Sequence, residues 1–368
     1  MRRRLYKRYV ALLMVICMVI TGCQEEVGLV VEAVHRNNSF RLTYVVPEVE
    51  VLTRTADVPV ANIDESRVRS LRLLFFEYDT YNNGKFLGTL GGTVEGNTLA
   101  GTGNMTIDFG VGTGVLNDDT DYNVLVIANA DSYNWSADML QTFCTGKTEN
   151  MVKMQLRLLI PLDDSTAEKN VYAIQDGCLP MSATAVKKAG KDMSVTLLRA
   201  MVRIDVCIAD EQKDEIMLTE ALLRNSSPVL PLFSDPLDIS SQRLALRTPA
   251  LSKDNFSIKG GLYAAESYRT ISSPKIKMNE ATCLLVSCHK KSYDGARTWY
   301  RVNVNIDAYD VQYLRRNNVY TVVINGIVMQ GAESADEAFG SDMTYIKSVT
   351  IPGEWNDSGV TPPIVEIQ

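Results

Sequence analysis

A chain of 368 residues with 46% hydrophobic and 22% charged residues has the composition of an ordinary globular protein. Of its 37 basic and 44 acidic residues, five basic ones and no acidic ones lie within residues 1–22, so the rest has 32 basic against 44 acidic residues and a net charge of −12. Such an acidic chain is not expected to bind nucleic acid, which requires a basic surface. Its length suits about two domains.

The first 23 residues have the pattern of a lipoprotein signal peptide. Five basic residues among the first eight precede an apolar run, Tyr9 to Ile20, which is shorter than the roughly 20 residues of a membrane span. Thr21, Gly22 and Cys23 follow, and a cysteine after small residues resembles a bacterial lipobox, whose thiol is acylated and becomes the mature N-terminus. We expect residues 1–22 to be removed and Cys23 to be lipidated; an ordinary signal peptide with an incidental cysteine is the alternative.

The side chains of residues 40 to 46 are expected to point alternately to the two opposite faces of a strand. Phe40, Leu42, Tyr44 and Val46 share one face, and this period of two predicts a half-buried strand. Pro47 is expected to end the strand or to place it at the edge of a sheet, because proline cannot donate a hydrogen bond to a sheet. The stretch over 55–63 is expected to be an exposed connection.

The rest of the chain predicts mostly short strands separated by turns that contain Gly, Asn or Pro. Strands are expected over 68–78, 105–109, 120–130, 195–208, 217–223, 281–289, 299–306 and 319–328. Helical turns are expected around 136–142 and 149–158, and a lysine-rich polar turn at 187–192 marks the expected domain boundary. This pattern favours a mainly β protein, with β-sandwiches and few short helices.

The cysteines and histidines do not suggest a metal or catalytic centre. Without Cys17 and Cys23, five of the seven cysteines remain, and an odd number does not form a closed set of disulfides. Cys283 and Cys288 are five residues apart in one strand, so they should face opposite sides and not bridge. We interpret these thiols mainly as small buried hydrophobic groups. With two histidines and no CxxC or HExxH motif, no zinc site is expected.

Other candidate sites have structural interpretations that we favour. The glycine-rich stretches 88–92 and 110–114 lack the Lys-Ser/Thr of a phosphate-binding loop and are interpreted as hairpin glycines. The pairs at 118–119 and 163–164 are aspartates without a full calcium-loop pattern, which favours solvated turns. His289 lies beside two lysines, and no Gly-x-Ser-x-Gly motif occurs. We therefore expect no metal, no cofactor and no enzymatic activity.

Seven short segments occur along the chain in an informative order. They are the lipobox at Cys23, Thr53–Ala56, Leu179–Ala183, Leu197–Asp205, Leu262–Ser267, Arg316–Ile324 and Trp355. In this order they resemble the fimbrillin-type pilins, the type V pili of Gram-negative anaerobes, which include major, tip and anchor subunits. Each segment is weak by itself, whereas the ordered set is fairly specific and covers nearly the whole chain. An unrelated secreted β-sandwich lipoprotein is the alternative.

The resemblance implies two transthyretin-like β-sandwich domains with Greek-key topology, assembled by strand exchange. In that family the lipoprotein precursor reaches the outer membrane, where an arginine-specific protease removes the N-terminal segment, and a strand of another subunit fills the groove left behind. The corresponding parts here are a signal peptide over 1–22, a removable segment over 23–54, an N-terminal domain over 55–190 and a C-terminal domain over 191–368.

The implied plug of the groove is the strand that carries Phe40, Leu42, Tyr44 and Val46. The implied cut lies between Arg54 and Thr55, in a stretch that suits nicking. Arg36 and Arg41 are rival sites, and a surface arginine without a role is the alternative reading of Arg54. The implied partners are other fimbrial subunits, the outer membrane through the lipid, and the protease, at a surface fimbrium.

Two further readings stay open. The segment 360–367 is a candidate donor strand, but Pro362 and Pro363 cannot donate to a ladder, so a polymerising stalk role is doubtful and a lipid-retained anchor is an alternative. A lipid-anchored glycan-binding module is the second hypothesis. Its exposed-aromatic candidates are Tyr81, Tyr133 and Trp135, although packing at the ends of the sandwiches is the interpretation that we favour for them.

Overall fold

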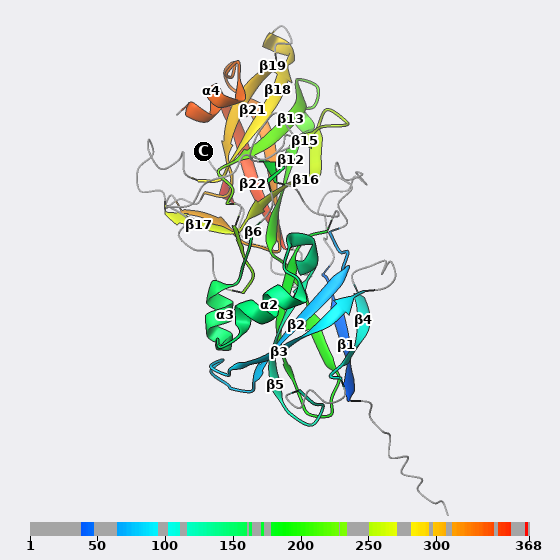
Figure 1. The fold of residues 1–368 in the computed structure, drawn as a ribbon. Helices are drawn as coiled ribbons and strands as arrows, with labels where there is room; N and C mark the ends of the chain where they lie inside the picture. Colours follow the sequence, from blue (N-terminus) through cyan, green and yellow to red (C-terminus); the bar gives the residue numbers. More distant parts are fainter. Residues whose placement is uncertain are drawn as a thin grey trace, which may run out of the picture.

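Two β-sandwiches, one from each half of the chain, are stacked end to end (Figure 1). The computed structural model describes residues 38–47, 65–94, 102–110, 116–159, 162–163, 171–172, 178–227, 229–233, 250–270, 281–293, 297–306, 311–341, 345–354 and 365–366. Strands dominate both halves and the helices are short, so the prediction of a mainly β protein is confirmed. None of the helices in these ranges has the length and apolar character needed to cross a lipid bilayer.

The N-terminal sandwich consists of a three-stranded and a five-stranded sheet. The first has the order β10-β1-β4 and contains β1 (Ser39–Val45), β4 (Thr102–Asp108) and β10 (Met193–Thr196). The second has the order β11-β9-β5-β2-β3 and contains β2 (Ser70–Glu77), β3 (Phe86–Thr93), β5 (Tyr122–Ala128), β9 (Met181–Lys187) and β11 (Leu198–Arg199). Alternating apolar side chains of both sheets form the core between them.

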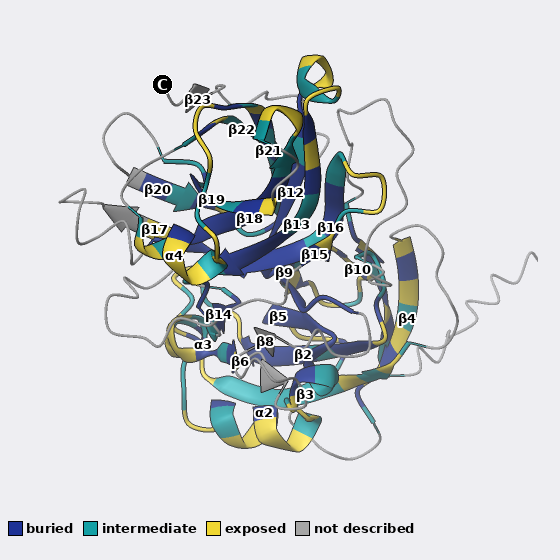
Figure 2. Cartoon of the chain, turned by 90° about the horizontal axis from the view of Figure 1, so that it is seen from above, coloured by how far each residue is buried: buried dark blue, intermediate teal, exposed yellow. Residues whose placement is uncertain are grey.

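Strand β5 shows why one sheet of this sandwich is buried on both faces. All seven of its residues are buried, and Val124 and Val126 face the three-stranded sheet, whereas Leu125 and Ile127 point away from it. This outer face is covered by α2 (Ala137–Cys144) and α3 (Glu149–Gln155), whose outer sides are exposed (Figure 2). Helices are thus confirmed around residues 136–142 and 149–155, whereas the expected continuation of the second helix to residue 158 is wrong, because Arg157–Leu159 form a strand.

Both helices begin at a side chain that caps the first turn. The Ser136 hydroxyl accepts a hydrogen bond from the Met139 N–H at 3.3 Å, and the Thr148 hydroxyl accepts one from the Met151 N–H at 3.4 Å. Serine and threonine are favoured at this position because they satisfy an N–H that has no partner inside the helix. The local sequence therefore fixes where the helical cover of β5 starts.

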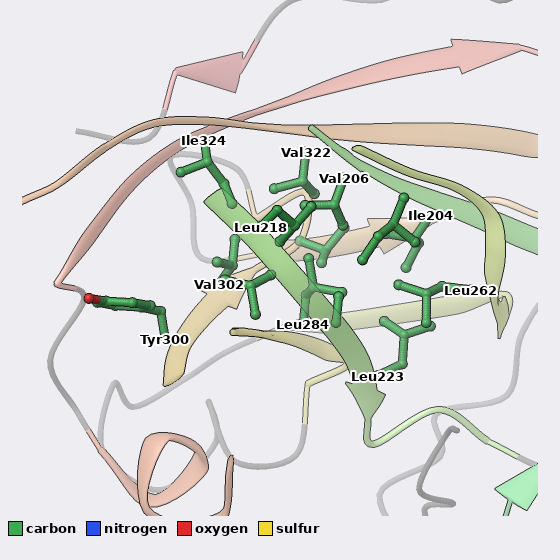
Figure 3. Packing of buried hydrophobic residues seen from close by; sticks show 14 of the residues in the cluster. Ile204, Val206, Leu218, Leu223, Leu262, Leu284, Tyr300, Val302, Val322 and Ile324 are labelled. Carbon is green, nitrogen blue, oxygen red and sulfur yellow. The ribbon is translucent and has the colours of Figure 1, made fainter. Parts of the chain in front are cut away.

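The C-terminal sandwich also packs two sheets around one core. One sheet has the order β16-β12-β21-β22-β23 and contains β12 (Met201–Ile208), β16 (Ser257–Ala265), β21 (Asn318–Ile327), β22 (Ile346–Glu354) and β23 (Val365–Glu366). The other has the order β15-β13-β18-β19 and contains β13 (Ile216–Arg224), β15 (Ala250–Leu251), β18 (Cys283–Lys290) and β19 (Arg297–Asn303). Figure 3 shows side chains such as Ile204, Leu218, Leu284 and Val322 meeting between the sheets.

Short elements complete the chain around and between the sandwiches. They are β6 (Arg157–Leu159) paired with β14 (Val229–Pro231), β17 (Ser267–Thr270) with β20 (Val311–Leu314), β7 (Leu162–Asp163) with β8 (Val171–Tyr172), and α4 (Ala335–Gly340). The β6–β14 pair joins a segment of the N-terminal half to one of the C-terminal half. Leu230 and Leu232 extend this contact into the apolar cluster beneath α2 and α3.

The stretch predicted as one strand over 195–208 is divided among three strands. β10 pairs with β1, β11 pairs with β9, and only β12 belongs to the C-terminal sandwich, where it pairs with β16 and β21. The domain boundary expected at residue 190 is corrected accordingly, because the polar turn at 187–192 joins two strands of the N-terminal sandwich. The chain passes from one sandwich to the other at Ala200.

Cys283 and Cys288 lie on opposite faces of β18, as their spacing predicts. Cys283 packs with Leu222 and Leu285, and Cys288 belongs to the core between the two C-terminal sheets. Burial raises the pKa of the Cys283 thiol to about 11 and that of the Cys288 thiol to about 12.

Because the thiolate is the reactive species, we expect neither Cys283 nor Cys288 to react with iodoacetamide at about pH 8 in the folded protein. Both should react fully after unfolding in denaturant, and mass spectrometry of their peptides measures this. Labelling of either thiol in the native protein as fast as in the unfolded chain would contradict the prediction.

Candidate functional site

The first strand, β1, is the central strand of its sheet. It pairs antiparallel with β4 from Ser39 opposite Asp108 to Val45 opposite Thr102, and parallel with β10 from Leu42 opposite Met193 onward. Figure 1 shows β1 beside β4 along the flank of the N-terminal sandwich. A strand bonded on both sides leaves two open edges if it is removed, and such edges are templates for pairing with another strand.

The inward face of β1 is almost completely buried. The exposed fractions are 4% for Phe40, 0% for Leu42 and 1% for Tyr44, and 1% for Val46 directly after the strand, while Val45 on the other face is 41% exposed. Burying a large apolar side chain stabilises by roughly 1.5–3 kcal/mol relative to leaving it exposed. The inward face therefore supplies a substantial part of the core of this sandwich.

The Phe40 ring enters a cluster of aromatic side chains contributed by other strands and loops. Its centroid lies 5.3 Å from that of Phe109 and 6.3 Å from that of Phe75, and Phe75 meets Tyr122 edge to face at 5.6 Å. Such arrangements are worth about 0.5–1.5 kcal/mol per pair beyond the buried area. The pocket of Phe40 thus favours a ring over an aliphatic side chain.

A buried lysine closes this aromatic pocket. Lys187 is fully buried, and its ammonium lies 5.0 Å from the centroid of the Phe40 ring and 5.9 Å from that of Phe109. The same ammonium donates to Asp118 Oδ1 and to the Lys188 carbonyl, both at 2.7 Å. A buried charge needs such partners to offset its lost hydration. Asp118 thus forms an ion pair rather than the solvated turn that the sequence predicts.

The two ends of β1 are fixed by polar contacts. The Asn38 carbonyl accepts from the Phe109 N–H at 2.8 Å, and its side-chain amide bonds the Asp118 N–H and the Gly110 carbonyl, each at 3.1 Å. At the other end the Val45 carbonyl accepts from the Leu197 N–H at 2.8 Å. The register of β1 is therefore determined at both ends as well as along its inward face.

Tyr44 lies over a glycine of the neighbouring strand. A Cβ built on Gly103, directly opposite it in β4, would lie 2.3 Å from the Tyr44 hydroxyl, so only glycine leaves room for this ring. Among the described residues the Tyr44 hydroxyl is buried without a hydrogen-bond partner. An unsatisfied buried polar group of this kind costs about 1–3 kcal/mol.

The residues predicted for processing fall mainly outside the described part of the chain. Cys23, Arg36, Arg54 and Thr55 all lie there, so their roles stay predictions. Arg41, the other rival cleavage site, lies within β1 as expected, where its N–H donates to Asp192 Oδ1 at 2.9 Å. A peptide bond inside a paired strand is a poor protease substrate, which favours Arg54 over Arg41.

A buried polar network at the junction of the two sandwiches was not predicted from the sequence. Arg203 binds both carboxylate oxygens of Asp205 at 2.8 and 2.6 Å and lies 3.1 Å from Glu65. Tyr263 donates to Glu65 at 2.5 Å, and Arg199, fully buried, donates through Nε to the Glu65 carbonyl at 2.8 Å. The signal was present in the segments Leu197–Asp205 and Leu262–Ser267, whose polar residues meet here.

The network also fixes the first described residue after the expected cleavage stretch at the junction. Glu65 is the first described residue after the stretch that holds Arg54 and Thr55, and it is held by both arginines and by Tyr263. Asn317, from the segment Arg316–Ile324, accepts from the Arg199 N–H at 3.0 Å. The start of β2 is thereby attached to the C-terminal sandwich, independently of β1.

The aromatic residues considered for glycan binding divide into two groups. Tyr133 is buried and donates to the Cys178 carbonyl at 2.8 Å, and Trp135 packs edge to face on Phe143 at 5.3 Å. Both side chains therefore contribute to packing, which is the interpretation favoured from the sequence. Tyr81 is 78% exposed. The glycine-rich stretch at 88–92 lies within β3 rather than in a turn.

No protein-family model matches the chain, and no curated protein matches its sequence. Solved structures nevertheless match its two-sandwich fold. The solved structure of the tip fimbrial protein Mfa3 from Porphyromonas gingivalis, in a C-terminally truncated form, matches with a TM-score of 0.50 and 13% identity, covering 86% of this chain and 100% of that one. This likeness shows that the chain has the fold of a fimbrial protein, as the resemblance of its segments implied.

Two candidate cell adhesion proteins also match along most of their length. One is from Parabacteroides distasonis, with a TM-score of 0.47, 14% identity and coverage of 87% of this chain and 98% of that one. The other is from Bacteroides eggerthii, with a TM-score of 0.48, 15% identity and coverage of 87% and 97%.

Proposed function

We propose that this chain is a structural subunit of a surface fimbrium that contributes to adhesion. It is exported as a lipoprotein acylated at Cys23, reaches the outer membrane, and assembles by strand exchange after an arginine-specific protease cuts between Arg54 and Thr55. Its partners are other fimbrial subunits. The fold shared with a fimbrial tip protein and the ordered segments of the sequence support this proposal.

One observation carries the proposal, namely the position of β1. This strand is central in its sheet and, together with Val46 directly after it, buries four apolar side chains, and the stretch that holds Arg54 is its covalent connection to the rest of the sandwich. A single cut there turns β1 into a strand held by non-covalent contacts alone. An incoming strand then gains both open edges and the apolar pockets, as in other cases of strand addition.

The N-terminal sequence and intact mass of the protein recovered from the surface of native cells test this function. A chain that starts at Thr55 is the expected result for an activated subunit. A chain that starts at an acylated Cys23 in every surface copy would instead exclude activation by proteolysis and support a lipid-retained anchor.

Replacement of Cys23 by serine should prevent acylation, because serine lacks the thiol that takes up lipid. We expect the Cys23→Ser protein to accumulate in the periplasm as a soluble form, measured by cell fractionation and by intact mass. A Cys17→Ser protein is the matched control and should behave like the native chain. Lipidated Cys23→Ser protein at the outer membrane would show that this cysteine is not the attachment site.

A lipid-retained anchor is the alternative role within a fimbrium. The segment 360–367 contains Pro362 and Pro363, and its described residues, Val365–Glu366, pair with the chain's own β22. Both observations disfavour a stalk subunit that donates this segment to its neighbour. A surface lipoprotein that binds glycans or proteins rests on Tyr81 alone among the three aromatic candidates.

A further inference from the structure

Two short ribbons lie on the same side of the molecule near the junction of the sandwiches (Figures 1 and 2). One is β17–β20 from the C-terminal half, and the other is β6–β14, which joins the two halves. Both carry apolar or aromatic side chains that the fold does not bury, because Tyr268 of β17 is 51% exposed and Leu159 of β6 is 61% exposed. The proposed function uses neither ribbon, so this surface is left without a role.

The β17–β20 ribbon presents two tyrosine rings and an arginine. Tyr268 and Tyr313 are directly opposite each other in the ladder, and their rings meet edge to face at 5.6 Å. The guanidinium of Arg315 lies over the Tyr313 ring, 4.4 Å from its centroid, and the Arg315 N–H donates to the Tyr320 hydroxyl at 3.0 Å. The ring and the backbone bond therefore position Arg315, although this residue is exposed.

Two further arginines extend this group toward the N-terminal sandwich. Arg316 donates through Nη1 to the carbonyls of Pro231 and Leu232 at 3.1 and 2.6 Å. Arg157 is directly opposite Pro231 in the β6–β14 ladder. Burial, and after it the charge of Arg316, lowers the pKa of Arg157. Both arginines thus lie at the same short strand, close enough for their charges to interact.

The charges of these three arginines are poorly neutralised by the described side chains. Among the residues that the structure describes, the three form one ion pair, between Arg316 Nε and Glu266 Oε2 at 3.7 Å. Arg157 donates to the Leu156 carbonyl at 3.1 Å, which leaves further N–H groups of its guanidinium for a ligand. From residue 23 onward the chain carries 32 basic against 44 acidic residues, so such a gathering of arginines is exceptional on it.

Together these side chains form one row that crosses the junction, called here the basic row, in the order Tyr268, Tyr313, Arg315, Arg316 and Arg157. We propose that the basic row binds an acidic polysaccharide, with carboxylate or sulfate groups at the arginines and sugar rings against the tyrosines. Guanidinium groups bind such anions through paired hydrogen bonds, and tyrosine combines an apolar ring with a polar tip. The inference goes beyond the proposed function, because the site needs neither acylation nor proteolysis.

The layout of the basic row favours a carbohydrate over an acidic peptide. The half-exposed ring of Tyr268 offers a flat surface on which a sugar ring can pack. The arginines follow one another from one ribbon to the next, so they suit a polymer that repeats an anionic group along its length. Because the chain as a whole is acidic and repels anions, binding should depend on these arginines and not on the general charge of the surface.

Binding of the uncut full-length protein to immobilised polymers, measured by biolayer interferometry, tests the inference. The probes are heparin, with sulfate and carboxylate groups, polygalacturonate, with carboxylates alone, neutral dextran, and poly-L-glutamate as an acidic peptide. The variants are Arg157→Gln, Arg315→Gln and Tyr268→Ala. Arg41→Gln is the matched control, because Arg41 is exposed on the outward face of β1. Arg316 is left unchanged, since it also fixes the backbone of β14.

We expect at least one of the two acidic polysaccharides to bind, the preferred one showing whether sulfate or carboxylate is recognised, and dextran not to bind. Poly-L-glutamate should bind about tenfold more weakly than the preferred polysaccharide, because it offers no sugar ring to the tyrosines. Arg157→Gln and Arg315→Gln should each weaken binding about tenfold, since each removes a charge-assisted contact, and Tyr268→Ala about fivefold. Arg41→Gln should bind like the native chain, and circular dichroism verifies that each variant is folded.

Three results would overturn the inference. The first is absence of binding to both acidic polysaccharides. The second is equal binding by the native chain, Arg157→Gln and Arg315→Gln, or an equal loss in Arg41→Gln, which would place the contact elsewhere or ascribe it to general charge. The third is binding of poly-L-glutamate as tight as that of the preferred polysaccharide, which would assign the basic row to an acidic peptide. None of these results affects the proposed strand exchange, because the measurement uses the uncut chain.

Discussion

Replacement of Arg203 by alanine is expected to lower the free energy of unfolding by about 3–5 kcal/mol, because it leaves buried carboxylates without their partner. Asp205 is 2% exposed and accepts two hydrogen bonds from this arginine, and Glu65 lies 3.1 Å from it. Burial by itself lowers the pKa of Arg203, but its hydrogen bonds to Asp205 and the charges of Asp205 and Glu65 together outweigh burial and raise the pKa. The stability of the junction therefore depends on this guanidinium.

Urea unfolding followed by circular dichroism measures the effect of Arg203→Ala. Arg224→Ala is the matched control, because Arg224 pairs with Asp336, whose side chain is 83% exposed. Such a pair contributes at most about 1 kcal/mol. Equal losses in the two variants would show that the junction network does not stabilise the protein beyond an ordinary surface ion pair.

Replacement of Leu42 by alanine is expected to cost about 2–5 kcal/mol, because the side chain is completely buried at the centre of β1 and its removal leaves a cavity. The loss should be confined to the N-terminal sandwich, since Leu42 belongs to the core between β1 and the five-stranded sheet. In the chain cut after Arg54, the same change should speed release of the N-terminal segment.

Differential scanning calorimetry of the uncut chain and the rate of segment release from the cut chain measure these two effects. Val45→Ala serves as the control, because Val45 occupies the outward face of the same strand and is 41% exposed. The role given to β1 would have to be abandoned if Leu42→Ala left the unfolding transition unchanged.

The parts of the fold with a strong local pattern were predictable. β1 alternates because one of its faces is buried, and β5 is a continuous apolar run because sheet and helices cover both of its faces. The helices α2 and α3 follow capping residues. In each case the residues that cause the element are adjacent in sequence.

The strands that were missed depend on distant partners. β9 is rich in small residues and β16 contains two glycines, so neither has a β-type pattern, and their burial comes from strands far away in the chain. Gly91 in β3 has a φ of +125°, and a Cβ there would lie 2.1 Å from the Leu71 carbonyl oxygen. The strand therefore requires glycine at this position, although a glycine in the sequence argues against a strand.

The polar parts of the site were harder still. The sequence predicts a polar turn for the lysine-rich segment that holds Lys187, but its ammonium is buried and bonded to Asp118, 69 residues away. Glu65 and Arg203 are separated by 138 residues. Ion pairs between such distant positions leave no periodic trace in the sequence, because each partner is defined only by the finished fold.

The pairing of β1 along both of its sides has a mechanical consequence. Tension applied along the axis of a strand in this position strains the ladders to β4 and β10 together, so many hydrogen bonds share the force. Tension applied across the strand would break them one after another. A strand paired with both β4 and β10 and pulled along its own axis is therefore suited to withstand drag from flowing liquid, although no covalent bond holds it in the sheet.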